Sequence, residues 1–114
     1  MADSNSYRAW SIISLRYGYV EKYAARKVKL EISRILWEIW DPIGVNDIPA
    51  ARDEYDSYVN DVFIMLIGES SDEELGKHLL GIATVTMGLS GPTLERMMST
   101  VQALRAIPVP AETE

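Results

Sequence analysis

The sequence predicts an all-α fold, a small bundle of four to five helices joined by short loops. Apolar residues recur at helical spacing along most of the chain, and glycines and prolines gather between these stretches. Short connections place successive helices side by side and antiparallel. A chain of 114 residues with 47% hydrophobic residues is long enough to bury one core. We therefore expect a single domain over residues 1–114, with flexible ends at 1–6 and 108–114.

Two helices are expected before the first proline. Over residues 7–17, Trp10, Ile13 and Tyr17 share a helical face, although part of this stretch also fits a strand. After Gly18, residues 19–40 predict one long helix, because they are rich in helix formers and contain no glycine or proline. Its core-facing stripe is Val28, Ile32, Ile35, Leu36 and Ile39, and Leu30, Trp37 and Trp40 project to the other side. This helix is either a central helix covered on both sides or a helix whose second side is free to bind a partner.

The next helix follows a loop over residues 42–49. Asp41-Pro42 ends the long helix, because proline disfavours the helical conformation of the residue before it. Pro49 suits a first helical turn, so we expect a helix from there to about Ile67. Its core-facing residues are Tyr55, Tyr58, Val59, Val62, Phe63 and Leu66, while Ile64 and Ile67 point to the polar side.

Two further helices complete the prediction. Ser71 and Glu74 match a capping box, in which each side chain bonds the other residue's backbone N–H. The helix that follows buries Leu75, Leu79, Ile82 and Val85, and Gly88 is its expected C-terminal cap. After Pro92, the last helix carries Leu94, Met97, Met98, Val101 and Leu104 on one side, and Pro108 closes it.

The composition excludes several classes of function. The chain has no cysteine, which removes disulfides and cysteine-ligated zinc and fits a reducing compartment. No apolar run could cross a bilayer, and the N-terminus lacks the layout of a signal peptide, so we expect a cytoplasmic protein with no membrane partner. His78 is the single histidine, and we interpret it as a partly buried structural residue. We expect no catalytic residue, metal ligand or cofactor, because no nucleophile motif or phosphate-binding loop is present.

The charge is unevenly distributed. The net charge is −6, yet the residues up to Arg34 carry seven basic and three acidic side chains, a net +4. The residues after Arg34 carry four basic and fourteen acidic side chains, a net −10. Nucleic acid is therefore not expected as a partner, because most of the molecule would repel phosphate.

The candidate site is an acidic and aromatic surface around the Asp41-Pro42 turn. Two tryptophans precede the turn, and carboxylates and tyrosines follow it. Protein interfaces favour aromatic anchors, and acidic side chains attract basic partners. The alternative is that the aromatic residues pack in the core and the acids cap helices or face water. The candidate binding residues are Trp37, Trp40, Asp41, Asp53, Glu54, Asp56, Tyr58 and Asp61.

The same region resembles a family of short, uncharacterised bacterial helical proteins. The resemblance is carried by Trp40-Asp41-Pro42-Ile43-Gly44-Val45, by Asp53-Glu54-Tyr55-Asp56 and by the Ser71-capped helix, and it covers roughly residues 32–89. It implies a helix that ends in a Trp-Asp-Pro-x-Gly turn, an acidic and aromatic helix, and a further helix. It implies no activity.

Three hypotheses of function follow. The first is a non-enzymatic binding or regulatory module with a protein partner, basic in character. The second is an immunity or antitoxin-like protein that neutralises a basic toxin, because acidic clusters speed association with a cation. The third is a small enzyme whose carboxylates hold a divalent cation. Self-association is a further expectation, because Leu30, Trp37, Ile64 and Ile67 exceed what one face of each helix buries.

Overall fold

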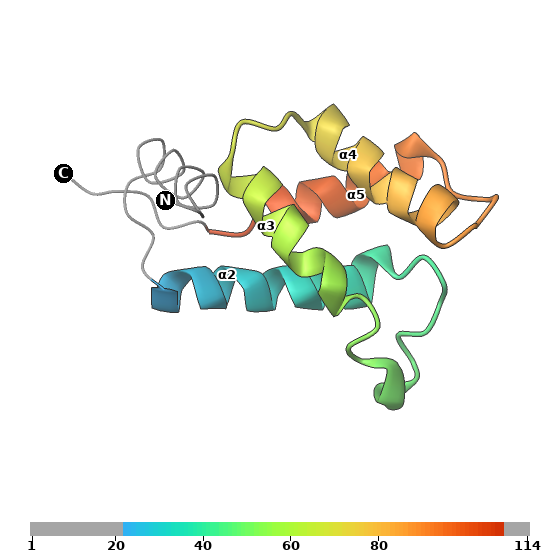
Figure 1. The fold of residues 1–114 in the computed structure, drawn as a ribbon, viewed down its shortest axis with the longest axis horizontal. Coiled ribbons are helices and arrows are strands. Elements are labelled where there is room, and N and C mark those ends of the chain that lie inside the picture. Colours follow the sequence, from blue (N-terminus) through green and yellow to red (C-terminus); the bar gives the residue numbers. More distant parts are fainter. Residues whose placement is uncertain (1–21, 109–114) are drawn as a thin grey trace, which may run out of the picture.

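The computed structural model describes residues 22–108, and this part of the chain is a helical bundle without strands (Figure 1). The predicted all-α class is confirmed. The α-helices are α2 (Lys22–Ile35), α3 (Val59–Ile67), α4 (Asp72–Gly81) and α5 (Leu94–Arg105). The expected helix over residues 7–17 and both expected flexible ends lie outside the described residues, apart from Pro108. No helix of the described part has the length and apolar character needed to span a membrane.

Four shorter helical segments complete the described part of the chain. Two are π turns that extend a helix: η1 (Leu36–Trp40) follows α2, and η4 (Ile82–Thr86) follows α4. Their last hydrogen bonds span five residues, since the amide of Asp41 donates to the carbonyl of Leu36 at 2.9 Å. The other two are 3₁₀ turns before α3: η2 (Pro49–Ala51) and η3 (Asp56–Tyr58).

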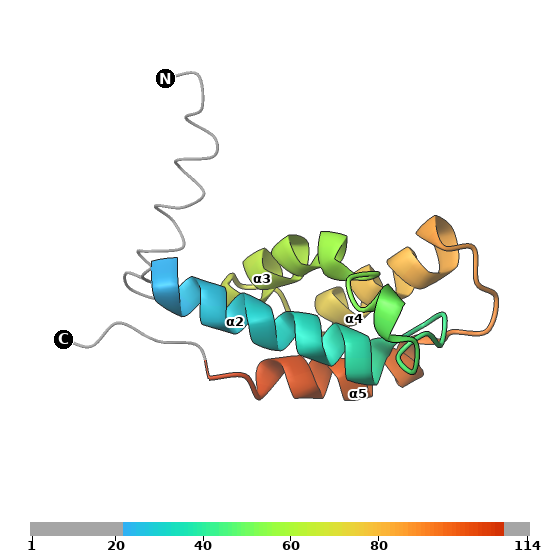
Figure 2. The same ribbon diagram turned by 90° about the horizontal axis from the view of Figure 1, so that it is seen from below.

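The helix α2 lies along one edge of the bundle and packs against two other helices (Figure 1). Contacts join α2 to both α3 and α5, which lie above and below it in the view of Figure 2. The helix α4 packs mainly against α5 and also touches α3. The predicted second side of this helix is covered at Trp37 and Trp40, which are buried, but not at Leu30, which is 63% exposed.

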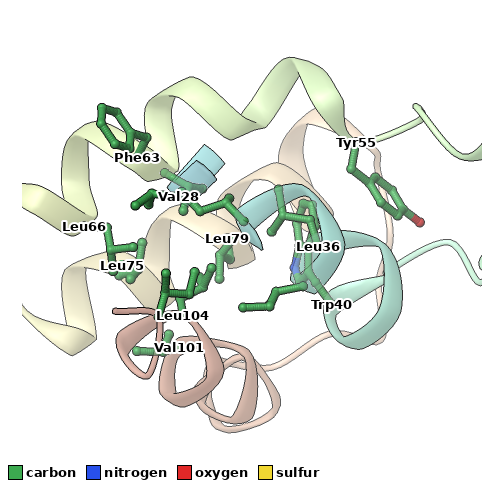
Figure 3. Close-up of a cluster of buried hydrophobic side chains, with 14 of the residues drawn as sticks. Val28, Leu36, Trp40, Tyr55, Phe63, Leu66, Leu75, Leu79, Val101 and Leu104 are labelled. Atoms are coloured by element: carbon green, nitrogen blue, oxygen red, sulfur yellow. The ribbon is translucent and has the colours of Figure 1, made fainter. Parts of the chain in front are cut away.

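One hydrophobic core joins the four helices (Figure 3). Gly76 lets α4 approach α5 closely, because a Cβ atom there would lie 3.0 Å from Leu94 Cδ1 and 3.2 Å from Met98 Sδ. The fully enclosed aliphatic side chains are Ile32, Leu36, Val62, Ile67, Leu75, Leu79, Val101 and Leu104.

The predicted capping box and the predicted C-terminal glycine of the fourth helix are confirmed. Ser71 and Glu74 form the capping box, with the Glu74 amide donating to Ser71 Oγ at 3.0 Å and the Ser71 amide donating to Glu74 Oε1 at 2.7 Å. Gly88 follows η4 with a φ of 75°, the left-handed conformation expected of a C-terminal glycine. Arg105 connects the end of α5 to the start of α4, because its Nε donates to Asp72 Oδ1 at 2.8 Å.

The predicted core stripes are wrong at their C-terminal ends. Ile39 is 44% exposed and Val85 is 82% exposed, whereas Trp37 and Trp40 are buried. All four lie within the π turns. A π turn holds more residues than an α turn, so the fourth residue after Leu36 faces the core instead of the third.

Two further predictions about the third helix are wrong. It begins at Val59 rather than Pro49, because residues 49–58 fold into the two 3₁₀ turns and the link between them. Ile67 is fully buried instead of facing the polar side, because α3 packs against both α2 and α4. Ile64 is 41% exposed, as its spacing predicts.

Candidate functional site

The aromatic residues of the predicted site lie together, but they are packed into the core. Trp37 and Trp40 are buried, Tyr55 is 2% exposed, and Tyr58 is partly buried. The Tyr55 ring centroid lies 5.3 Å from that of Trp40 and 6.4 Å from that of Trp37, and the Trp40 and Tyr58 rings meet edge to face at 5.9 Å. The expectation that the indoles stand free at the surface is therefore wrong. Packing of large aromatic surfaces explains their position.

Asp41 organises the turn that follows the tryptophans. Its carboxylate accepts hydrogen bonds from the Tyr55 hydroxyl at 2.7 Å, from the Val45 amide at 2.8 Å and from the Asn46 amide at 3.2 Å. The Tyr55 hydroxyl in turn accepts from the Ile43 amide at 3.3 Å. In Figure 3 the Tyr55 ring lies at the edge of the hydrophobic cluster and its hydroxyl points away from it. The carboxylate of Asp41 thus fixes the loop to the core.

The backbone of Asp41 adopts an unusual conformation. Its φ is 31° and its ψ is 60°, in the left-handed region that aspartate tolerates better than most residues. The Gly44 amide donates to the Asp41 carbonyl at 3.1 Å, and Gly44 itself has a φ of 69°. Asp41 therefore reverses the chain by its backbone and holds the reversed segment by its side chain.

The environment of Tyr55 perturbs its ionisation. Burial, and next the hydrogen bond to Asp41, raise the pKa of the Tyr55 phenol above its ordinary value. Both effects favour the neutral phenol, because the phenolate would lose hydration and would face the negative carboxylate. Tyr55 is therefore a fixed donor to Asp41 at neutral pH.

The remaining predicted acids are exposed, and they lie in different settings. Asp53 and Glu54 stand in the link between the two 3₁₀ turns, and Asp61 lies in the first turn of α3. Asp56 is hydrogen-bonded to α2, because the Ser33 hydroxyl donates to Asp56 Oδ1 at 2.9 Å. Among residues 22–108, no group of three or more histidine or acidic side chains could hold a metal ion.

Arg52 is the one basic residue between Asp41 and Asp61, and it is exposed while its guanidinium contacts Ser33 and Trp37. Its Nη1 donates to Ser33 Oγ at 3.3 Å, and its guanidinium carbon lies 5.5 Å from the Trp37 ring centroid. This is the distance of a cation–π contact. Sequence reasoning missed Arg52 and Ser33; the available signal was a single cation within an acidic run that follows a tryptophan.

The segment 41–55 projects beyond the helices as a loop (Figure 1). We call residues 43–56 the acidic loop. Two large apolar side chains of this loop are exposed, Ile43 by 39% and Ile48 by 48%. Successive turn hydrogen bonds hold its backbone, including those from the Ile48 amide to the Val45 carbonyl and from the Glu54 amide to the Ala51 carbonyl, both at 2.9 Å. The isoleucines were not among the predicted binding residues, although their place beside glycine and proline marks them as loop residues.

A groove of about 640 Å³ adjoins the Asp41 turn. One wall comes from the end of η1 and the turn, where the exposed Ile39 lies beside Asp41 and Pro42. The other wall comes from residues 89–92 and the first two turns of α5, which contribute Glu95 and Arg96. The groove therefore adjoins the turn from which the acidic loop begins.

His78 does not belong to this region. It is partly buried on α4, as the sequence predicts, and its Nε2 atom is enclosed without a hydrogen-bond partner among residues 22–108.

The chain was compared with protein-family models, with curated proteins and with solved structures, and it shows no significant match to any of them.

Proposed function

We propose that the chain is a non-enzymatic protein-binding module and that the acidic loop is its contact surface. The observation that carries this proposal is the exposure of Ile43 and Ile48 on a loop that Asp41 fixes to the core. A rigid loop loses little conformational entropy when it binds, so its contacts contribute more fully to affinity. The proposed partner offers an apolar pocket for one or both isoleucines.

The charge of the loop specifies the partner further. From Ile43 to Asp56 the acidic loop carries four acidic residues and one basic residue. The cation Arg52 is exposed but engaged with Ser33 and Trp37, so the charge that the loop presents to a partner is mainly acidic. We therefore propose a basic protein surface around the apolar pocket. Such complementarity speeds association more than it slows dissociation.

A charge-reversal experiment tests the surface. Proteins captured from a lysate of the source organism are identified and purified, and their binding to the wild type and to D53K/E54K is measured by biolayer interferometry. Both side chains are exposed, so we expect the variant to fold normally. We expect an association rate at least about tenfold lower, a weaker dependence on salt, and a dissociation rate that changes less.

The control carries the same change of charge elsewhere. Glu31 lies on α2 and Glu73 in the first turn of α4, and both are exposed and outside the acidic loop and the groove beside it. The variant E31K/E73K is expected to bind nearly as the wild type does, and I48A to dissociate faster. If D53K/E54K and I48A bind every captured partner as tightly as the wild type does, the acidic loop is not the contact surface.

A further inference from the structure

A second surface lies at the other end of α2, away from the acidic loop. A groove of about 650 Å³ runs between the N-terminal half of α2 and the chain that leaves α5. Its lining is mostly apolar and includes Tyr23, Ala24, Leu30 and Ile107. We call it the α2 groove.

Two large side chains of the α2 groove are unusually exposed. Tyr23 is 68% exposed and Leu30 is 63% exposed, and they lie seven residues apart on one side of the helix. The groove floor is already packed, since Val28 and Ile107 are buried there. A contiguous apolar surface of this kind marks a contact site.

We propose that the α2 groove is the docking site of the chain's own residues 7–17. This segment lies just before α2 in the sequence, and only residues 18–21 separate it from Lys22, where α2 begins. A link of this length, with Gly18 in it, returns the chain antiparallel to the helix that follows. A second copy of the chain would have to reach a groove that this tethered segment reaches at a far higher effective concentration.

The apolar pattern of the segment matches that of the groove. Read toward the N-terminus, the segment has apolar residues spaced by four and then three positions, at Tyr17, Ile13 and Trp10. Read toward the C-terminus, α2 has the same spacing at Tyr23, Lys27 and Leu30. In an antiparallel pair these two sets lie opposite each other, with Trp10 over Leu30 and Tyr17 over Tyr23. Arg8 then falls beside Glu31, which lines the far end of the groove.

Thermal unfolding of the full chain tests the contact. Docking predicts that Leu30→Ala lowers Tm by about 4–8 °C and that Trp10→Ala lowers it similarly, while the double variant falls by less than the sum. The matched control is Val85→Ala, which truncates an 82% exposed side chain outside the groove and leaves Tm unchanged. A Leu30→Ala variant as stable as Val85→Ala would overturn the proposal.

Disulfide trapping tests which segment occupies the groove. The chain has no cysteine, so Ile13→Cys with Lys27→Cys creates the only thiol pair. A bond requires Cβ atoms within about 4.5 Å. Mild oxidation is expected to give a monomer two hydrogens lighter, whereas a pair of Ile13→Cys with Ser57→Cys stays reduced. A covalent dimer of the first pair would assign the groove to a second copy, and equal oxidation of both pairs would show that no docking exists; either result overturns the proposal.

Discussion

Asp41 is the residue on which the turn after η1 depends, and its chemistry explains why an aspartate stands there. Its side chain accepts three hydrogen bonds, one from a hydroxyl and two from amides. An asparagine would present one acceptor oxygen instead of two, and an alanine would present none. The left-handed backbone adds a second requirement that most side chains meet only with strain. A single short acid satisfies both.

Tyr55 gives a prediction at the same scale. The unfolded phenol ionises near pH 10, and the folded phenol ionises at higher pH because its pKa is raised. The protein therefore keeps the full contribution of Tyr55 to stability below about pH 10 and loses it as the pH rises toward the folded-state value. The free energy of unfolding should fall by about 1.4 kcal/mol per pH unit from this residue alone. Urea unfolding at pH 9, 10 and 11 measures the slope.

Tyr55→Phe is the variant that isolates this effect. At pH 7 it should cost about 1–3 kcal/mol, because the Asp41 carboxylate loses a buried donor. Above pH 10 the free energy of unfolding of this variant should fall less steeply with pH than that of the wild type, by about 1.4 kcal/mol per pH unit. Equal slopes for Tyr55→Phe and the wild type would contradict the role given to the phenol.

The residue scale also shows why the site was predicted only in part. Trp37 and Trp40 were assigned to a surface because acidic residues surround them in the sequence. In the structure each indole is covered by residues distant along the chain, such as Tyr55 over Trp40. The exposure of each tryptophan depends on these long-range contacts, so the residues next to it in the sequence could not predict it.

At the scale of the element, the two π turns explain the errors in helix register. The core stripes of α2 and α4 were predicted correctly up to Leu36 and Ile82, where regular α-helix ends. Beyond these residues the wider turns rotate the side chains, so Ile39 and Val85 face water. A prediction that applies one helical period throughout a segment cannot anticipate this change.

The glycines of α4 provide a test of helix packing. Gly81 has helical dihedral angles, and a Cβ atom added there would meet open space, so Gly81→Ala should stabilise the protein by about 0.5–1 kcal/mol. Gly76 contacts Leu94 and Met98, so Gly76→Val should destabilise it by about 1–3 kcal/mol. Urea unfolding of both variants measures the two changes. Two changes of the same sign would show that α4 and α5 are not held as closely as the side-chain distances indicate.

At the scale of the whole molecule, one core is shared by four helices. Leu36, Leu79 and Leu104 come from different helical segments and are all fully buried in the same cluster. If any one helix of the described part unfolded, the buried side chains of the other helices would be exposed to water. The all-α class and the order of these helices could be predicted from the sequence, because both depend on local spacing and helix ends.

A shared core predicts a single cooperative unfolding transition. Denaturation curves from far-ultraviolet circular dichroism and from tryptophan fluorescence should coincide, in a Trp10→Phe background where the buried Trp37 and Trp40 give the signal. Leu79→Ala should lower both midpoints together and cost about 2–5 kcal/mol, because it opens a cavity in the core. Separate midpoints would mean that part of the bundle unfolds alone.

The π turn at Leu36–Trp40 has an evolutionary consequence. Its hydrogen bonds span one residue more than those of an α-helix, so it resembles a helix that has accepted an insertion. A descendant chain that lost Ile39 would bring the following tryptophan to the third position after Leu36, which faces the same side in a regular helix. The segment is therefore a place where related chains can differ by one residue in length while the tryptophan keeps its partners and the Asp-Pro reversal keeps its direction.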